Sequence, residues 1–112
     1  MDFKTINSQE AFEQALHENK AVLFYFSTLS CSVAETLQPK IMELLKTDYP
    51  RMSFYFVDMQ FNTGLSASCN VFVEPTVLVY FHGKESIRKS RNFGISELSN
   101  AIHRLYQFTF SD

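Results

Sequence analysis

The stretch VLFYFSTLSCSVAETLQPKI, residues 22–41, contains the features that decide the fold. With the preceding alanine it begins as AVLFYFS, a continuous apolar and aromatic run that is typical of a strand buried on both faces. From about Ser32 to Thr47 apolar residues recur every three or four positions, which predicts an amphipathic helix interrupted by Pro39. Cys31 lies at the junction. The order is therefore buried strand, cysteine, helix.

The residues before this stretch predict a short first strand near residue 3 and a helix from about Ser8 to Glu18. Asn7 followed by Glu10 has the spacing of a capping box, so we expect Asn7 to cap this helix. Further along, MSFYFVD at residues 52–58 predicts a second buried strand. The polar stretch at residues 62–72 predicts one or two helical turns.

The C-terminal third of the chain predicts a hairpin and a closing helix. TVLVYF and ESIRKSR flank His82–Lys84, which predicts two antiparallel strands joined by a tight turn. Ser96 is expected to cap the last helix. The side chains that this helix should turn inward are Leu98, Ile102, Leu105 and Tyr106.

The predicted element order is (β)-α-β-α-β-α-β-β-α, an α/β chain with a central mixed sheet of four or five strands. Such a sheet needs helices on both faces. At 112 residues the chain is expected to form one domain over residues 1–112.

Composition narrows the function classes. The net charge of −2 favours neither nucleic acid nor an anionic membrane as a partner. The longest apolar run, AVLFYF, is far shorter than the roughly 20 residues of a membrane span. MDFKTINSQE at the start resembles no secretory signal, and two cysteines suit a reducing compartment. We therefore expect a cytoplasmic protein.

Four features resemble thioredoxins, over residues from about 3 to 106. Two are the strand running into Cys31 at a helix start and Pro39 inside that helix. The others lie in EPTVLVYFHGKE, where Pro75-Thr76 resembles the family's cis-proline segment and Gly83 its hairpin turn. Cys31 and Pro75 are 44 positions apart, a spacing typical of the family. The resemblance implies a thioredoxin-like fold with a cis peptide bond before Pro75, beside Cys31.

The chain departs from the family where the chemistry would occur. The family motif is Trp-Cys-Gly-Pro-Cys. At the corresponding positions this chain keeps the first cysteine, which attacks the disulfide, and lacks the second, which resolves the mixed disulfide. Tyr25 stands where the family has a buried acid, and Glu74 precedes the proline. The stretch between Gly83 and Gly94 is also a few residues longer than usual. The five residues of the altered motif are Ser30, Cys31, Ser32, Val33 and Ala34.

Two interpretations of Cys31 stay open. A thiol at a helix N-terminus is favoured as thiolate, whereas a nearby Glu74 would oppose this by like-charge repulsion. Cys31 is therefore either a reactive thiol or a relic of an active ancestor. Without a neighbouring second thiol, efficient dithiol reductase activity is not expected, because a mixed disulfide would have no intramolecular route of release.

Two functions follow. The first, which we favour slightly, is thiol-disulfide exchange through Cys31 alone, with protein or peptide thiols and disulfides as partners and glutathione as a candidate small thiol. The alternative is a redox-inert module that holds a peptide or protein in the cis-proline groove. No cofactor is expected. The side chains expected to bind the partner are Ser30, Ser32, Val33, Glu74, Pro75 and Thr76, with Thr28 and Leu29 beside them.

Other candidates receive structural interpretations. Cys69 is expected to be a buried structural cysteine, and it could resolve a mixed disulfide only if its loop approached Cys31. The histidines lack ligand-like spacing, so no metal site is predicted. The basic run IRKSR is interpreted as a solvated sheet edge that discourages strand addition. Phe72 is the one aromatic residue expected near the groove. The three histidines are His17, His82 and His103.

Overall fold

A computed structural model describes residues 3–29 and 32–111, with the backbone alone for residues 32–35. It contains a five-stranded mixed sheet in the order β1-β3-β2-β4-β5 and four helices among these residues. Strands β1, β3 and β2 run parallel, while β4 and β5 are antiparallel to their neighbours. The predicted fold class and element order are therefore confirmed. The elements are β1 (Lys4–Ile6), α1 (Gln9–Glu18), β2 (Ala21–Ser27), α2 (Ser32–Asp48), β3 (Ser53–Asp58), α3 (Thr63–Ser68), β4 (Thr76–Phe81), β5 (Lys84–Ser90) and α4 (Ile95–Thr109).

Strand β2 is the centre of the molecule, and all seven of its residues are buried. Side chains alternate between the two faces of a strand, so a strand covered on both sides is apolar at every position. Leu23 and Tyr25 enter one core, and Val22 and Phe24 enter the other. The uninterrupted apolar run in the sequence follows from this double burial.

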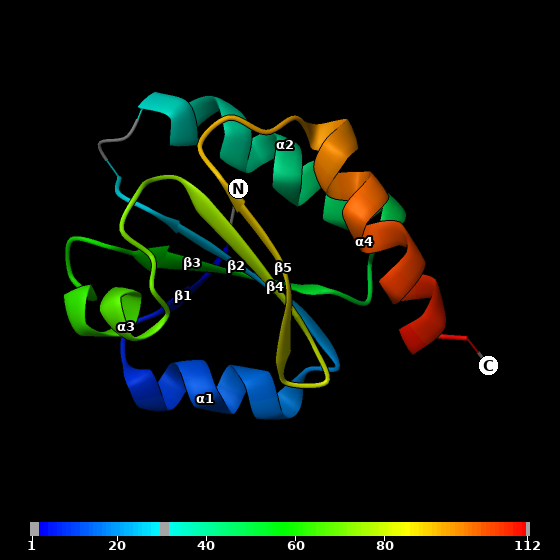
Figure 1. The fold of residues 1–112 in the computed structure, drawn as a ribbon, viewed down its shortest axis with the longest axis horizontal. Coiled ribbons are helices and arrows are strands. Elements are labelled where there is room, and N and C mark those ends of the chain that lie inside the picture. The colour runs from blue at the N-terminus through cyan, green and yellow to red at the C-terminus, as the bar shows by residue number, and fades with distance from the viewer. Residues whose placement is uncertain (1–2, 30–31, 112) are drawn as a thin grey trace.

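Two helices cover each face of the sheet. Helices α2 and α4 lie over one face, and α1 and α3 lie over the other (Figure 1). On the α2/α4 side the core includes Ile41, Leu98 and Ile102. On the α1/α3 side it includes Phe12 and Leu65. Helix α2 continues through Pro39 to Asp48. Among the described residues, no helix combines the length and apolar character needed to cross a membrane.

Both predicted helix caps were wrong by one or two positions. The cap of α1 is Ser8, whose Oγ accepts a 3.0 Å hydrogen bond from the backbone N–H of Ala11, and not Asn7. The cap of α4 is Gly94, whose carbonyl accepts from the N–H of Leu98 at 3.1 Å, so Ser96 lies within the first turn. Capping residues follow one another closely in both stretches, and only the backbone geometry selects between them.

Two burial predictions also need correction. The first half of β3 is only partly buried, because its outer neighbour β1 is three residues long and leaves part of it uncovered. On α4, Leu105 is 37% exposed, whereas Leu98 and Ile102 are fully buried and Tyr106 packs partly against the core. Helix α4 thus extends beyond the sheet that would bury its last turns.

The hairpin between β4 and β5 turns through two residues, His82 and Gly83, with φ values of 55° and 77°. Two consecutive residues with positive φ form the turn that matches the twist of an antiparallel hairpin. Lys84, which the sequence placed in the turn, is the first residue of β5. The turn lies at the end of the sheet opposite to the candidate site described below.

The burial pattern of α4 can be tested with two identical substitutions. Leu98→Ala removes a side chain that is fully buried, so we expect a loss of about 2–5 kcal/mol in the free energy of unfolding. Leu105→Ala, two turns later on the same helix, should lose about 1 kcal/mol or less because that side chain is already part exposed. Urea denaturation measures both, and equal losses would contradict the assigned core.

Candidate functional site

The candidate site lies where β2 and β3 end and β4 begins. Phe26 pairs with Thr76, and Ser27 pairs with Asp58, so the three strand ends share one edge of the sheet. This edge is on the left in Figure 1, together with α3. Ser30 and Cys31, which the sequence assigned to the site, lie outside the described residues. Cys31 directly precedes Ser32, the first residue of α2, in the chain. Val33 is the next helical residue.

The peptide bond between Glu74 and Pro75 is cis, in agreement with the expectation from the sequence. Pro75 is buried and Glu74 is half-buried, at the end of the segment that joins α3 to β4. The position of this bond relative to Cys31 falls outside the described residues. Tyr25, in the place of the family's buried acid, is fully buried, with its ring 6.1 Å from those of Phe54 and Phe56. That position is therefore part of an aromatic core.

Thr76 braces the cis peptide from the inside. Its side chain is 1% exposed, and its Oγ1 donates to the carbonyl of Val73 at 2.7 Å. The same oxygen lies 3.2 Å from the hydroxyl of Ser90 on β5. The hydroxyl thus joins the segment before the proline to the edge strand. A contact between Thr76 and a ligand stays a prediction. Because its side chain is enclosed, Thr76 would make such a contact through its backbone.

Arg88 fixes the segment from Cys69 to Pro75 at its other end. Its guanidinium donates to the carbonyls of Cys69 and Asn70 at 2.7 and 3.0 Å. It also makes a two-pronged ion pair with Glu85, with distances of 2.9 and 2.8 Å. The hydrogen bonds to Glu85 raise the pKa of Arg88 above its ordinary value. Charged, forked donors hold carbonyl and carboxylate oxygens with defined geometry, so this clamp orients the segment.

A β-bulge makes the clamp possible. Arg88 pairs with Leu78 and Glu85 pairs with Tyr80, so both face the same side of the sheet although they are three residues apart. In a regular strand such residues would face opposite sides. The register shift between Val79 and Tyr80 inserts one extra residue and reverses the alternation.

The basic run IRKSR is therefore more than a solvated edge. Strand β5 is an edge strand, as expected, but two of the three cations of the run form ion pairs within the chain. Arg88 holds the segment just described, and Lys89 forms a 2.7 Å ion pair with Glu97 on α4. The third cation, Arg91, has a different environment.

Cys69 is buried beneath the clamp, in the core on the α1/α3 side. Burial raises the pKa of its thiol above the ordinary value, opposed by hydrogen bonds from Ser68 and Tyr80 and by the charge of Arg88. The pKa of Tyr80 is raised as well, chiefly by burial. A thiol with a raised pKa has little thiolate at neutral pH and is a poor nucleophile. The expectation of a buried cysteine is confirmed.

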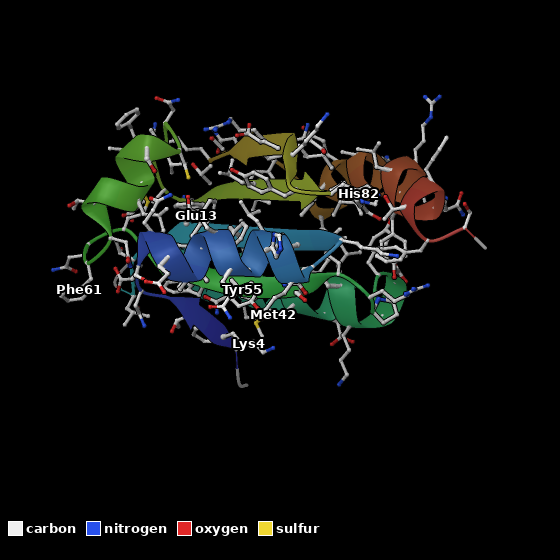
Figure 2. All side chains as sticks on the ribbon, turned by 90° about the horizontal axis from the view of Figure 1, so that it is seen from below. Lys4, Glu13, Met42, Tyr55, Phe61 and His82 are labelled. Carbon is white, nitrogen blue, oxygen red and sulfur yellow. The ribbon has the colours of Figure 1, made fainter. Side chains whose placement is uncertain are left out.

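Four exposed apolar side chains lie close in the chain to the ends of β2 and β3 or the start of β4. Leu29 comes after β2, Phe61 after β3, and Phe72 and Val73 just before the cis peptide. The first three are more than 70% exposed, and Val73 is 37% exposed. Figure 2 shows Phe61 at the end of the molecule remote from His82 and the hairpin turn. We call these four side chains the apolar rim of the candidate site; Phe61 and Val73 were not predicted to belong to it.

A small pocket adjoins the cis peptide. Its volume is about 290 Å³, and the described residues that line it are Glu74, Pro75, Arg91 and Asn92. Arg91 and Asn92 belong to the connection between β5 and α4 and were not assigned to the site from the sequence. The only signal that pointed to them was the unusual length of the stretch between Gly83 and Gly94.

The histidines lie away from this edge of the sheet. His17 on α1 and His82 in the hairpin turn line one surface pocket, while His103 lies exposed on α4. In the part of the chain that the structure describes, no group of three or more His, Cys, Asp or Glu side chains is arranged to hold a metal ion.

Comparisons with known proteins agree with this architecture. Residues 3–104 match the family Thioredoxin. The thioredoxin-like protein YdfQ of Bacillus subtilis (strain 168) is 21% identical over 102 residues, which cover 91% of this chain and 90% of that protein. Thioredoxin of Fasciola hepatica is 26% identical, with a TM-score of 0.82 over 91% of this chain and 98% of its own. Thioredoxin of Plasmodium falciparum, also 26% identical, has a TM-score of 0.80 over 90% and 97%.

The clamp can be tested by removing its guanidinium. In Arg88→Ala the carbonyls of Cys69 and Asn70 lose a charged donor, and we expect the free energy of unfolding to fall by about 1–2 kcal/mol. Amide hydrogen exchange should accelerate most at residues 70–74, where the segment is released. Arg104→Ala, an exposed arginine on α4, is the matched control and should change neither quantity. Unchanged exchange at residues 70–74 in Arg88→Ala would exclude the clamp.

The raised pKa of Cys69 can be tested by alkylation. At any pH below its pKa, a thiol with a raised pKa has a smaller thiolate fraction than an ordinary cysteine. In the variant Cys31→Ser, iodoacetamide should therefore modify native Cys69 more slowly from pH 7 to 9 than the same residue after unfolding in urea. Burial should slow the native reaction further. Equal rates in the two states would show that Cys69 is neither shielded nor shifted.

Proposed function

Because this chain belongs to the Thioredoxin family, we propose that it carries out thiol-disulfide exchange through the single thiol of Cys31. The observation that carries the proposal is the pairing of two family features in one chain. A cysteine directly precedes helix α2, and a cis peptide lies at the edge of the sheet where β2 ends. The partners in this proposal are protein or peptide thiols and disulfides.

The exchange balances with one thiol on the protein. The Cys31 thiolate attacks a partner disulfide R–S–S–R′, forming Cys31–S–S–R and releasing R′–S⁻, which takes up a proton. An external thiolate such as that of glutathione, G–S⁻, then attacks the sulfur of R and releases the Cys31 thiolate together with R–S–S–G. The cysteine is regenerated, and the disulfide has moved from R′ to glutathione without net oxidation or reduction.

Two features support a single-thiol route. Ala34 stands three residues after Cys31, where the family has its resolving cysteine. The other cysteine, Cys69, is buried with a raised pKa, so it is a poor candidate to attack a mixed disulfide. Oriented intramolecular attack can reach effective molarities of about 10⁵ M or more, so its loss leaves slow release by external thiols. Dithiol reductase activity should accordingly be weak.

A second candidate function is favoured by the apolar rim. Leu29, Phe61, Phe72 and Val73 are exposed together at the edge that carries the cis peptide. Large exposed apolar patches commonly mark the binding sites of proteins or peptides. In this alternative the chain holds a partner at the cis-proline groove and does no thiol chemistry. It predicts binding that survives replacement of Cys31.

The exchange proposal is tested with matched single-cysteine variants. Cys31→Ser should abolish glutathione-dependent reduction of a small disulfide whose R group is glutathione, so that R–S–S–G is glutathione disulfide, while Cys69→Ser should retain it, because only Cys31 is proposed to react. The assay follows formation of glutathione disulfide with glutathione reductase and NADPH. Activity retained in Cys31→Ser, or absent from the wild type, would favour the alternative binding function.

A gain-of-function variant provides the complementary test. Ala34→Cys places a second thiol three residues after Cys31, where the family forms its active disulfide, at modest expected loss of stability. We expect insulin reduction with dithiothreitol to rise from near background to a partial level. Recovery should be incomplete, because Tyr25 cannot act as a buried carboxylate. If both thiols stay free under mild oxidant, Cys31 is not placed as in thioredoxins.

A further inference from the structure

The pocket beside the cis peptide is lined by two opposite charges that form no ion pair with any of the described residues. Glu74 and Arg91 both line it, yet among the described residues neither side chain takes part in an ion pair. The other cations of this region, Arg88 and Lys89, are each paired with a glutamate. Glu74 and Arg91, which form no ion pair among the described residues, therefore line the same pocket.

The backbone holds Arg91 firmly in this place. Its N–H donates to the carbonyl of Pro75 at 2.9 Å, and its φ of 57° lies in the left-handed region. Two residues later, Phe93 packs against the core, and its N–H donates to the carbonyl of Arg91 at 3.2 Å. A non-glycine residue keeps a positive φ only where its surroundings enforce it. The connection is thus anchored on both sides of Asn92, which leaves Arg91 and Asn92 exposed at the pocket.

We infer that this pocket binds the zwitterionic head group of an α-amino acid, and that its ligand is the γ-glutamyl end of glutathione. The carboxylate of the head group pairs with the guanidinium of Arg91, which can bind it through two parallel hydrogen bonds. The ammonium group pairs with the carboxylate of Glu74. Asn92 offers an amide with both donors and an acceptor.

Charge and size together disfavour purely acidic and purely basic peptides as ligands of this pocket. An acidic peptide would be attracted by Arg91 but repelled by Glu74, and a basic peptide would meet the reverse. A ligand that carries both charges on one carbon satisfies both residues. The volume of about 290 Å³ is at the lower limit of small-molecule pockets and accommodates one amino-acid head group.

The choice of glutathione rests on the proposed exchange function, because glutathione combines such a head group with a thiol. In that function the bound tripeptide would be the external thiol that regenerates Cys31. The binding itself involves only Glu74, Pro75, Arg91 and Asn92, so it can be measured apart from any thiol chemistry.

The test uses S-methylglutathione, which keeps the head group and has no thiol. Titrated into the full chain and followed by NMR, it should shift the backbone amides of Glu74, Thr76, Arg91 and Asn92. Arg91→Asn removes the guanidinium and keeps a residue that tolerates a positive φ. We expect it to weaken binding about two- to fivefold, the range for a solvent-exposed ion pair. Arg104→Ala is the control and should bind as the wild type does.

A second ligand isolates the contribution of Glu74. The analogue with a glutaryl group in place of the γ-glutamyl group lacks only the ammonium. It should bind the wild type about two- to fivefold more weakly than S-methylglutathione. In Glu74→Gln the two ligands should bind equally, because the carboxylate that distinguishes them is gone.

The inference is overturned if the amide shifts occur elsewhere or if Arg91→Asn binds as tightly as the wild type. Free glutamate carries the same head group and should bind about as tightly as S-methylglutathione, so its failure to bind would overturn the assignment to an α-amino-acid head group. Binding should also persist in Cys31→Ser. If S-methylglutathione binds as expected while Cys31-dependent exchange is absent, the exchange function fails and the pocket assignment stands.

Discussion

The complete burial of strand β2 is the constraint on which the rest of this structure depends. A seven-residue strand that is apolar on both faces must be covered by helices on both sides and paired on both edges. Strands β3 and β4 supply the pairing, and two pairs of helices supply the cover. Among the described residues no Asp, Glu, Lys or Arg is buried in this interior, and the fully buried Tyr25 stands where the family has a buried acid. The charged side chains of the candidate site lie outside it, where β2 ends.

At that edge, the segment before β4 is held by three kinds of contact. Arg88 binds its first carbonyls, Thr76 braces it from the core, and the N–H of Arg91 binds the carbonyl of Pro75. Each contact comes from β4, β5 or the connection that follows β5. The edge hairpin therefore acts as a support that presents Glu74 and Pro75 in fixed positions. A binding surface built in this way needs little ordering when a ligand arrives, which favours affinity.

The proposed function separates recognition from chemistry. The chemistry that the sequence offers is that of one thiol, because Ala34 replaces the second family cysteine and Cys69 is buried with a raised pKa. By contrast, two features are available for binding a partner. They are the exposed apolar rim and the pocket lined by two opposite charges. A cysteine whose mixed disulfide is cleaved only by an external thiol benefits from a surface that binds this thiol. The single cysteine and the charged pocket are consistent with each other in this respect.

Much of the fold was predictable from the sequence, because the buried strand and the helical periodicity are local patterns that burial imposes. The cis-proline segment was expected from the resemblance to thioredoxins. The resemblance to thioredoxins singled out Cys31, Glu74 and Pro75 as candidate site residues; the cis bond before Pro75 is confirmed, and the roles of the three residues stay predictions. The exact caps at Ser8 and Gly94 depended on backbone geometry that neighbouring residues share. The roles of Arg88 and Arg91 were decided by tertiary structure alone. A bulge in β5 turns Arg88 toward the α1/α3 face, and a hydrogen bond to Pro75 places Arg91 beside Glu74. No local pattern encodes which side of a sheet a side chain faces after a bulge, or which distant charge it meets, because both depend on how separate segments pack.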